Sequence, residues 1–142
     1  YGKGGEEQKL RDLIKKHEAE NYIFLRGQQK LKEIYQDYEL YLAGSMSEGF
    51  GLTLMEAVGG GLPIIGFDVR YGNPTFIDEG KNRYLIPVDD HTSPREKVEA
   101  LTDRLIRLFT EADLESFHEH SYEKAKGFLT KEVELRWKNI VG

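Results

Sequence analysis

Hydrophobic and polar positions along the chain predict helices and strands in turn. Residues 6–20 place Leu10, Leu13 and Ile14 at helical spacing with charged residues between them, which predicts a surface helix. Short apolar runs predict four strands, at residues 21–27, 38–44, 62–67 and 83–88. The segments between these strands predict three helices, at residues 28–37, 51–59 and 73–80.

This alternation predicts an α/β fold: a Rossmann-like parallel sheet of at least four strands with helices on both faces. From Ser93 onward the pattern predicts only helices, at residues 93–109, 113–128 and 131–140, and Ser93 is the expected N-cap of the first. We therefore expect residues 1–142 to form a single domain with a helical C-terminal section, residues 93–142. Residues 1–5 resemble the end of a strand entering a helix, so we also expect the sheet to begin upstream of Tyr1, as in the C-terminal half of a longer protein.

Composition and charge limit the classes of function. The 142 residues are the size of one ordinary domain. A formal net charge of −5 argues against a nucleic acid as partner, and we expect any peripheral membrane association to come only from regions outside the chain. The chain has no cysteine, which excludes disulfides, thiolate zinc sites and cysteine nucleophiles within it and agrees with a cytoplasmic location.

Two glutamates flank a glycine turn in "SEGFGLTLMEAVGGGLP", residues 47–63. The turn follows a predicted strand, and ligands of open α/β sheets lie at the carboxyl ends of the strands. A helix that begins near Gly51 leaves the amides of its first turn unpaired and carries about half a positive charge there, which suits a phosphate. Glu56 then lies about 7 Å along the helix, where it can accept hydrogen bonds from a ribose, and Glu48 lies on the other side of the phosphate.

Other interpretations of these carboxylates stay open. Both glutamates can be ordinary surface residues, with Gly49 and Gly51 shaping a loop. A glycoside hydrolase also uses two carboxylates, although a helix-opening glycine turn between them favours phosphate.

Several other polar residues have a structural alternative as well. His118 and His120 would face opposite sides of a helix, so we expect solvated surface residues and not metal ligands. Asp89 and Asp90 have the composition of a metal-binding pair, but paired acids before a helix are usually solvated.

Residues that follow two of the predicted strands can either contact a ligand or have only a structural role in the turn. Arg70, Tyr71 and Asn73 can cap a substrate pocket or build a turn. Arg26 and Gly27 can contact a nucleotide base or end a strand. We expect Trp137 to be a core or interdomain anchor.

The segment "SEGFGLTLMEAVGGGLPIIGFDV" resembles the signature of retaining nucleotide-sugar glycosyltransferases of the GT-B fold, glycosyltransferase group 1. That signature is Glu, seven residues, Glu, Ala, a turn of small residues and Gly-Leu-Pro. The following "GFDVRYGNPTFIDEGKN" is similar to the branch of bacterial accessory-secretion and wall teichoic acid N-acetylglucosaminyltransferases. The sequence departs from the family at Arg83, where glycine is usual, and at Glu79, which shifts the usual Asp-Gly step.

The resemblance implies roles for residues of this segment. Glu48 is expected beside the donor sugar as the catalytic residue, and Glu56 is expected to bind the ribose. The substrate-binding turn and helix start comprise Gly49, Phe50, Gly51, Leu52 and Thr53. The family's basic pair for the pyrophosphate has no match in the chain, and its expected position is upstream of Tyr1.

The implied reaction is transfer of a sugar from a uridine diphosphate donor, such as UDP-N-acetylglucosamine, to a hydroxyl with the anomeric configuration kept. No metal or cofactor is expected, because a helix N-terminus can stabilise the leaving group. The expected partners are the nucleotide-sugar donor, an N-terminal domain of the same protein, and an acceptor polymer or protein hydroxyl. We expect the chain alone to transfer no sugar.

Two alternative functions share these features: a sugar-nucleotide epimerase of the same fold, and a non-catalytic nucleotide-binding module. Release of free UDP would distinguish a transferase from an epimerase. Calorimetric titration with UDP would distinguish a nucleotide site from a structural loop.

Overall fold

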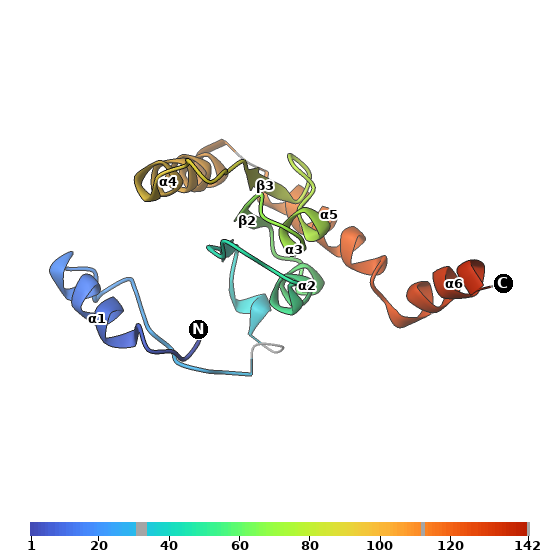
Figure 1. Cartoon of the computed structure of the whole chain (residues 1–142), viewed down its shortest axis with the longest axis horizontal. Helices are drawn as coiled ribbons and strands as arrows, with labels where there is room; N and C mark the ends of the chain where they lie inside the picture. The colour runs from blue at the N-terminus through green and yellow to red at the C-terminus, as the bar shows by residue number, and fades with distance from the viewer. Residues whose placement is uncertain (31–33, 112, 142) are drawn as a thin grey trace. The chain divides into compact units, whose positions relative to one another are not determined.

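The computed structural model describes residues 1–30, 34–111 and 113–141. The chain divides into two compact units, Tyr1–Glu33 and Ile34–Gly142 (Figure 1). Within the described residues, no helix combines the length and the apolar composition that crossing a membrane requires.

The first unit contains the predicted surface helix, α1 (Glu7–Lys16). None of its residues is buried. A salt bridge of 2.6 Å joins Arg11 to Glu7 one turn earlier, and two lysines in the last turn lie at the negative end of the helix dipole. The prediction of an exposed amphipathic helix is confirmed.

The predicted strand at residues 21–27 is wrong, because the structure assigns no strand to this segment. The amides of Tyr22 and Ile23 donate to the Ala19 carbonyl at 3.1 and 2.9 Å, which makes a turn after α1. Further on, the Gly2 amide donates to the Gly27 carbonyl at 2.8 Å. A strand needs a continuous ladder of such bonds to a neighbour, and apolar composition alone does not supply one.

The helix predicted at residues 28–37 overlaps residues 31–33, which lie outside the described residues. The part that follows them forms a short 3₁₀ helix, η2 (Tyr35–Asp37). The prediction of an α-helix is therefore wrong for residues 35–37.

The second unit is built on a parallel sheet of three strands: β1 (Tyr41–Ala43), β2 (Ile64–Phe67) and β3 (Arg83–Ile86). Their order is β1-β2-β3, with Ile64 opposite Tyr41 on one side and Arg83 on the other. The sheet is parallel as predicted. It has three strands in the described residues instead of at least four, because residues 21–27 do not join it.

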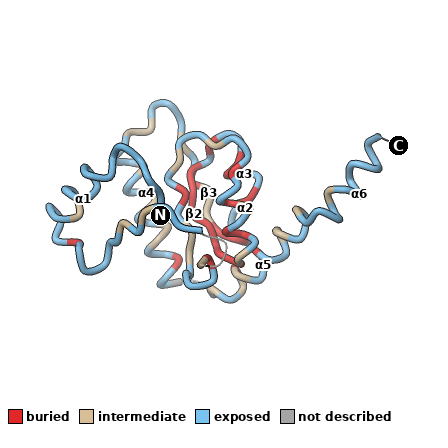
Figure 2. The backbone as a smooth tube through the Cα atoms, turned by 90° about the horizontal axis from the view of Figure 1, so that it is seen from below, coloured by how far each residue is buried: buried red, intermediate tan, exposed pale blue. Residues whose placement is uncertain are grey.

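Helices cover both faces of this sheet, which confirms the predicted fold class (Figures 1 and 2). Ile65 and Phe67 of β2 share a core cluster with Leu108 of α4 (Pro94–Glu111). Gly66 points to the opposite face, where α2 (Leu52–Gly59) and α3 (Gly72–Phe76) pack. All four residues of β2 are buried, which is the pattern of a strand covered on both sides.

The predicted N-cap of α4 is confirmed by a reciprocal pair of hydrogen bonds. The Glu96 amide donates to the Ser93 hydroxyl at 3.3 Å, and the Ser93 amide donates to the Glu96 carboxylate at 2.7 Å. This capping box satisfies two amides that the helix itself leaves unpaired. The bonds from Ser93 also hold the pKa of Glu96 below its ordinary value.

Arg83 occupies an unusual backbone position at the start of β3. Its φ of 142° lies in a region that glycine adopts more easily than a residue with a side chain. Its buried guanidinium lies 4.0 Å from the ring centroid of Tyr84 and 3.8 Å from that of Phe117. These two cation–π contacts offset part of the backbone strain.

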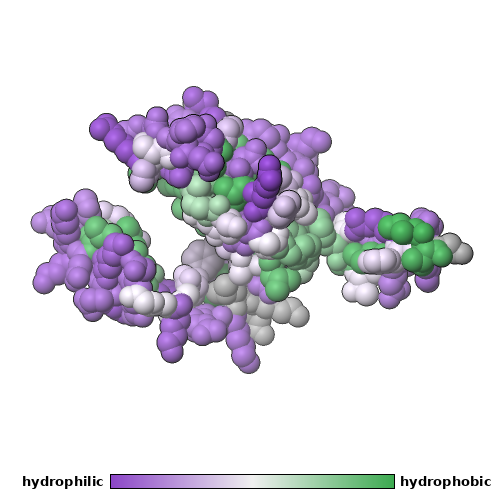
Figure 3. All heavy atoms as spheres, in the orientation of Figure 1, coloured by the Kyte–Doolittle hydropathy of each residue, from purple (hydrophilic) through white to green (hydrophobic). Residues whose placement is uncertain are grey.

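The C-terminal part consists of α5 (Leu114–Lys126), capped by Asp113, and α6 (Thr130–Val141). α5 packs on α2. No residue of α6 is buried, and Trp137 is 59% exposed. The hydrophobic residues of α6 are visible on its surface (Figure 3).

We predict that Leu108→Ala lowers the free energy of unfolding by about 2 to 5 kcal/mol, because Leu108 is fully buried between α4 and the sheet. Ile106 lies on the exposed side of the same helix, so Ile106→Ala should change the stability by less than about 0.5 kcal/mol. Urea unfolding followed by circular dichroism measures both. Equal losses in the two variants would contradict the packing of α4 through Leu108.

Candidate functional site

The N-terminal end of α2 is the centre of the candidate site. The helix begins as predicted, with Gly51 as N-cap at a φ of 83° and the Met55 amide donating to the Gly51 carbonyl at 3.0 Å. No side chain among the described residues caps this end. The amides of Leu52 and Thr53 therefore lack an intrahelical partner, and they are available to an anion.

The expectation that the N-terminal end of this helix is open at Gly51 is wrong. Gly51 itself is buried, because the side chain of Leu54 lies against it. The next residue, Leu52, is 64% exposed, and Thr53 is exposed as well. The accessible part of the helix end therefore begins one residue later than predicted.

The loop that carries Glu48 lies beside the loop that follows β2. The Glu48 amide donates to the Arg70 carbonyl at 3.1 Å, and the Tyr71 amide donates to the Glu48 carbonyl at 2.5 Å. Gly72 permits this approach, since a Cβ there would lie 2.9 Å from the Phe50 carbonyl oxygen and 3.1 Å from the Glu48 Cβ. Two loops at the carboxyl ends of β1 and β2 thus form one rim, where open α/β sheets bind ligands.

Phe50 fixes the turn between the two glutamates. Its ring meets the ring of Phe76 edge to face at a centroid distance of 5.4 Å, and Phe76 is fully buried. The exposed Gly49 has no heavy atom near its missing side chain. This aromatic contact adds to the backbone hydrogen bonds of Glu48 in holding the turn, while Gly49 stays exposed.

Glu56 lies on the exposed face of α2, three residues after Thr53. The Tyr35 hydroxyl donates to the Glu56 Oε2 atom at 3.1 Å, and the Tyr41 hydroxyl donates to the Thr53 Oγ1 atom at 3.1 Å. Burial raises the pKa of Tyr35, and the hydrogen bond and negative charge of Glu56 raise it further. Tyr35 therefore stays protonated as the donor.

Sequence reasoning missed both tyrosines. A signal for Tyr35 was present, because a tyrosine at an apolar position of an amphipathic segment must find a partner for its hydroxyl when the ring is buried. The sequence does not say which partner, since Tyr35 and Glu56 are 21 residues apart.

α5 supports α2 from the other end. Three of its side chains donate to carbonyls of the turn that joins α2 to β2: His118 to Gly61 at 2.7 Å, Ser121 to Leu62 at 2.8 Å, and Tyr122 to Gly60 at 3.2 Å. The expectation that His118 is solvated surface is therefore wrong. His120 is exposed as expected.

Two of the remaining candidates, Asn73 and Asp89, have structural roles. Asn73 is fully buried, and its Nδ2 atom donates to the Phe67 carbonyl at 2.7 Å, so it builds the turn after β2. Asp89 accepts from the amides of His91 and Thr92 and from the Thr92 hydroxyl, and these bonds lower its pKa. Within the described ranges, no group of three or more His, Asp or Glu side chains could hold a metal ion.

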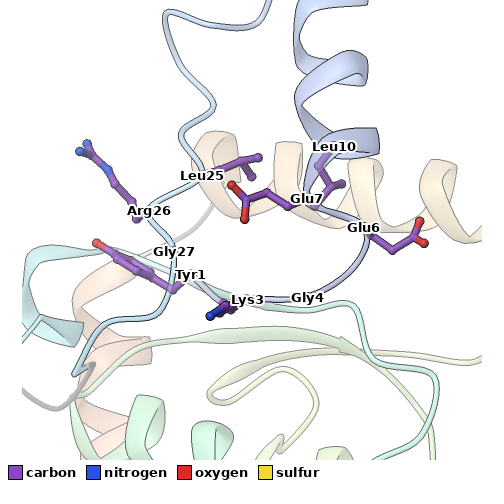
Figure 4. A pocket seen from close by; sticks show the side chains of 10 residues that line it. Tyr1, Lys3, Gly4, Glu6, Glu7, Leu10, Leu25, Arg26 and Gly27 are labelled. Atoms are coloured by element: carbon purple, nitrogen blue, oxygen red, sulfur yellow. The ribbon is translucent and has the colours of Figure 1, made fainter.

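The first unit contains a cavity of about 330 Å³ between residues 1–7 and residues 25–27 (Figure 4). The side chain of Leu25 points toward Glu7 and Leu10, while Arg26 extends away from them. The Arg26 guanidinium lies 4.8 Å from the ring centroid of Phe24. The Arg26 side chain therefore contacts a residue of its own unit.

A parallel sheet with helices on both faces, and a helix that begins at its carboxyl edge, is the architecture of the GT-B class of glycosyltransferases. The chain belongs to the family described as glycosyl transferases group 1, whose model matches residues 1–116.

Three similar proteins illustrate which members of the family the chain resembles. It is 54% identical over 142 residues to the UDP-N-acetylglucosamine–peptide N-acetylglucosaminyltransferase GtfA subunit of Limosilactobacillus reuteri, a match that covers 100% of the chain and 28% of that relative. The crystal structure of the pneumococcal O-GlcNAc transferase GtfA with UDP and GlcNAc matches with a TM-score of 0.90 and 51% identity, over 97% of this chain and 27% of that one. The structure of a mutant of S. aureus TarM in complex with UDP and other ligands matches with a TM-score of 0.79 and 26% identity, over 96% and 27%.

These matches confirm the predicted family and fold, and they include both parts of the predicted branch. The chain spans a little more than a quarter of the length of these relatives. The site residues themselves stay predictions.

We predict that Gly51→Ala lowers the free energy of unfolding by more than about 1 kcal/mol, because its φ is positive and a Cβ would lie 2.7 Å from the Leu54 Cδ1 atom. Gly49→Ala is the matched control, since no heavy atom lies within 4 Å of a Cβ there. Thermal unfolding measures both variants. A Gly51→Ala protein as stable as the control would contradict the described start of α2.

Proposed function

We propose that the chain is the donor-binding part of a cytoplasmic glycosyltransferase that moves a sugar from a UDP-sugar to a hydroxyl and keeps the anomeric configuration. The observation that carries this proposal is the uncapped end of α2 at Leu52 and Thr53, with Glu56 one turn further along the same helix. The names of the relatives favour UDP-N-acetylglucosamine as the donor and a peptide hydroxyl as the acceptor.

In this proposal the helix end binds the pyrophosphate. The free amides near Leu52 and Thr53 point along the helix axis, and the dipole adds about half a positive charge there. When the bond between sugar and phosphate breaks, negative charge builds up on the departing UDP. Donors that are already in place stabilise this charge without reorganisation.

The two glutamates have different tasks in the proposed mechanism. Glu56 accepts hydrogen bonds from the ribose hydroxyls and fixes the nucleotide along α2. Glu48 lies on the separate loop that pairs with residues 70 and 71, at the rim where the donor sugar would lie. Nucleotide binding and sugar positioning are thereby assigned to different elements.

The proposal also includes a further domain that completes the cleft and binds the acceptor. The chain spans 28% of the length of the L. reuteri relative, whose remaining length contains the rest of that enzyme. α6 supports this part of the proposal, because it carries exposed Leu135, Trp137, Ile140 and Val141 (Figure 3). A released isomer of the UDP-sugar in place of free UDP and a glycosylated acceptor would contradict the proposal and favour an epimerase.

We predict that Glu56→Gln in the intact enzyme weakens UDP binding about tenfold to a hundredfold, because each hydrogen bond to a charged group contributes about 1.5 to 3 kcal/mol. Glu119→Gln makes the same charge change at an exposed position of α5 and should leave the affinity unchanged. Isothermal titration with UDP measures both. An unchanged affinity of the Glu56 variant would remove this residue from the ribose.

We predict that Glu48→Gln lowers the turnover number more than it lowers the affinity for UDP, because this carboxylate is assigned to the reacting sugar. Steady-state transfer from UDP-N-acetylglucosamine to an acceptor peptide gives the turnover number, and titration with UDP gives the affinity. The same Glu119→Gln variant serves as control. If turnover is unchanged, Glu48 has only its structural role beside Tyr71.

A further inference from the structure

Tyr35 is a buried aromatic residue that touches the candidate site. It is only 5% exposed, although it lies on a short 3₁₀ helix of three residues. Its hydroxyl donates to the Glu56 Oε2 atom at 3.1 Å and lies 3.4 Å from the Thr53 carbonyl oxygen. The buried ring of Tyr35 therefore places its hydroxyl beside the carboxylate of the exposed Glu56.

The ring of Tyr35 has little freedom to move. A Cβ on Gly60 would lie 2.7 Å from the Tyr35 Cβ atom, so the backbone of the α2 end packs directly against this side chain. On another side the ring of Tyr41 lies at a centroid distance of 6.3 Å. A side chain confined in this way keeps its hydroxyl at one place, whereas an exposed glutamate alone samples several rotamers.

We infer that Tyr35 is a positioning residue. It holds the Glu56 carboxylate in the orientation in which this carboxylate accepts hydrogen bonds from the ribose hydroxyls of the donor nucleotide. This inference rests on the proposed function. An ionised carboxylate offers about four acceptor positions on two oxygens, so one bond from Tyr35 to Oε2 leaves positions for both ribose hydroxyls.

A consequence follows for nucleotide selectivity. If Tyr35 orients Glu56, loss of its hydroxyl weakens only those ligands that use Glu56. A nucleotide without ribose hydroxyls makes no such bonds and should not respond. Damage to the packing around Tyr35 would instead weaken both ligands, because the helix end that binds the phosphates would shift.

The test uses Tyr35→Phe in the intact enzyme, which keeps the ring and removes only the hydroxyl. Titration with UDP and with 2′,3′-dideoxy-UDP gives two dissociation constants for each variant. We expect the dissociation constant for UDP to rise about threefold to tenfold, the range of one ordinary hydrogen bond, while that for the dideoxy analogue stays unchanged. The loss should disappear in a Glu56→Ala background, where no carboxylate remains to be positioned.

Tyr122→Phe is the matched control. Its hydroxyl donates to the Gly60 carbonyl at 3.2 Å, so the same atom is removed near the same turn without touching Glu56. The control should change neither dissociation constant.

Three outcomes would overturn the inference, and they differ in what they say about the site. Equal weakening of both ligands by Tyr35→Phe would show a purely structural role. Unchanged UDP binding in Tyr35→Phe, together with weakened binding in Glu56→Gln, would reject Tyr35 and leave the proposed function intact. Unchanged UDP binding in Glu56→Gln would reject the ribose assignment itself, and the role of Tyr35 with it.

Discussion

The candidate site depends on a turn after α2 in which two glycines have no room for a side chain. α2 ends in three glycines, and at two of them a Cβ would collide with a tyrosine: Gly60 at 2.7 Å from Tyr35 and Gly61 at 2.4 Å from the ring of Tyr122. The two tyrosines come from distant parts of the chain. Because both tyrosine side chains pack directly against the backbone of this turn, they fix the C-terminal end of α2 within the second unit. The other end of the same helix is the one proposed to bind the donor.

Electrostatics limit what this helix end can do alone. A helix N-terminus supplies about half a positive charge, whereas the pyrophosphate of UDP carries at least two negative charges. Glu48 and Glu56 add further negative charge at the same rim. α2 itself carries no cationic side chain, so the proposed site requires such side chains from other segments, which agrees with the proposal that the chain is part of a larger binding cleft.

The sequence pattern predicted correctly those features that depend on interactions between residues close together in the chain. The buried run at β2, the glycine that opens α2 and the Ser93 cap of α4 all depend on residues that are close in sequence, and each was predicted. The strand at residues 21–27 was wrong because strand formation needs a partner that composition does not reveal. The prediction that His118 is a solvated surface residue was wrong because its carbonyl partner lies 57 residues away in the sequence. Tyr35 was missed for the same reason.

The departure from the family pattern at Arg83 bears on whether the site can still bind a donor. In a parallel sheet all strands present their carboxyl ends at one edge, and the candidate site follows β1 and β2 there. Arg83 is the first residue of β3 and therefore lies at the opposite edge. Its positive φ costs about 1 to 3 kcal/mol, and its contacts with Tyr84 and Phe117 supply a local compensation. Because Arg83 lies at the amino edge of the sheet, away from the loops at its carboxyl edge, this departure gives no argument against donor binding.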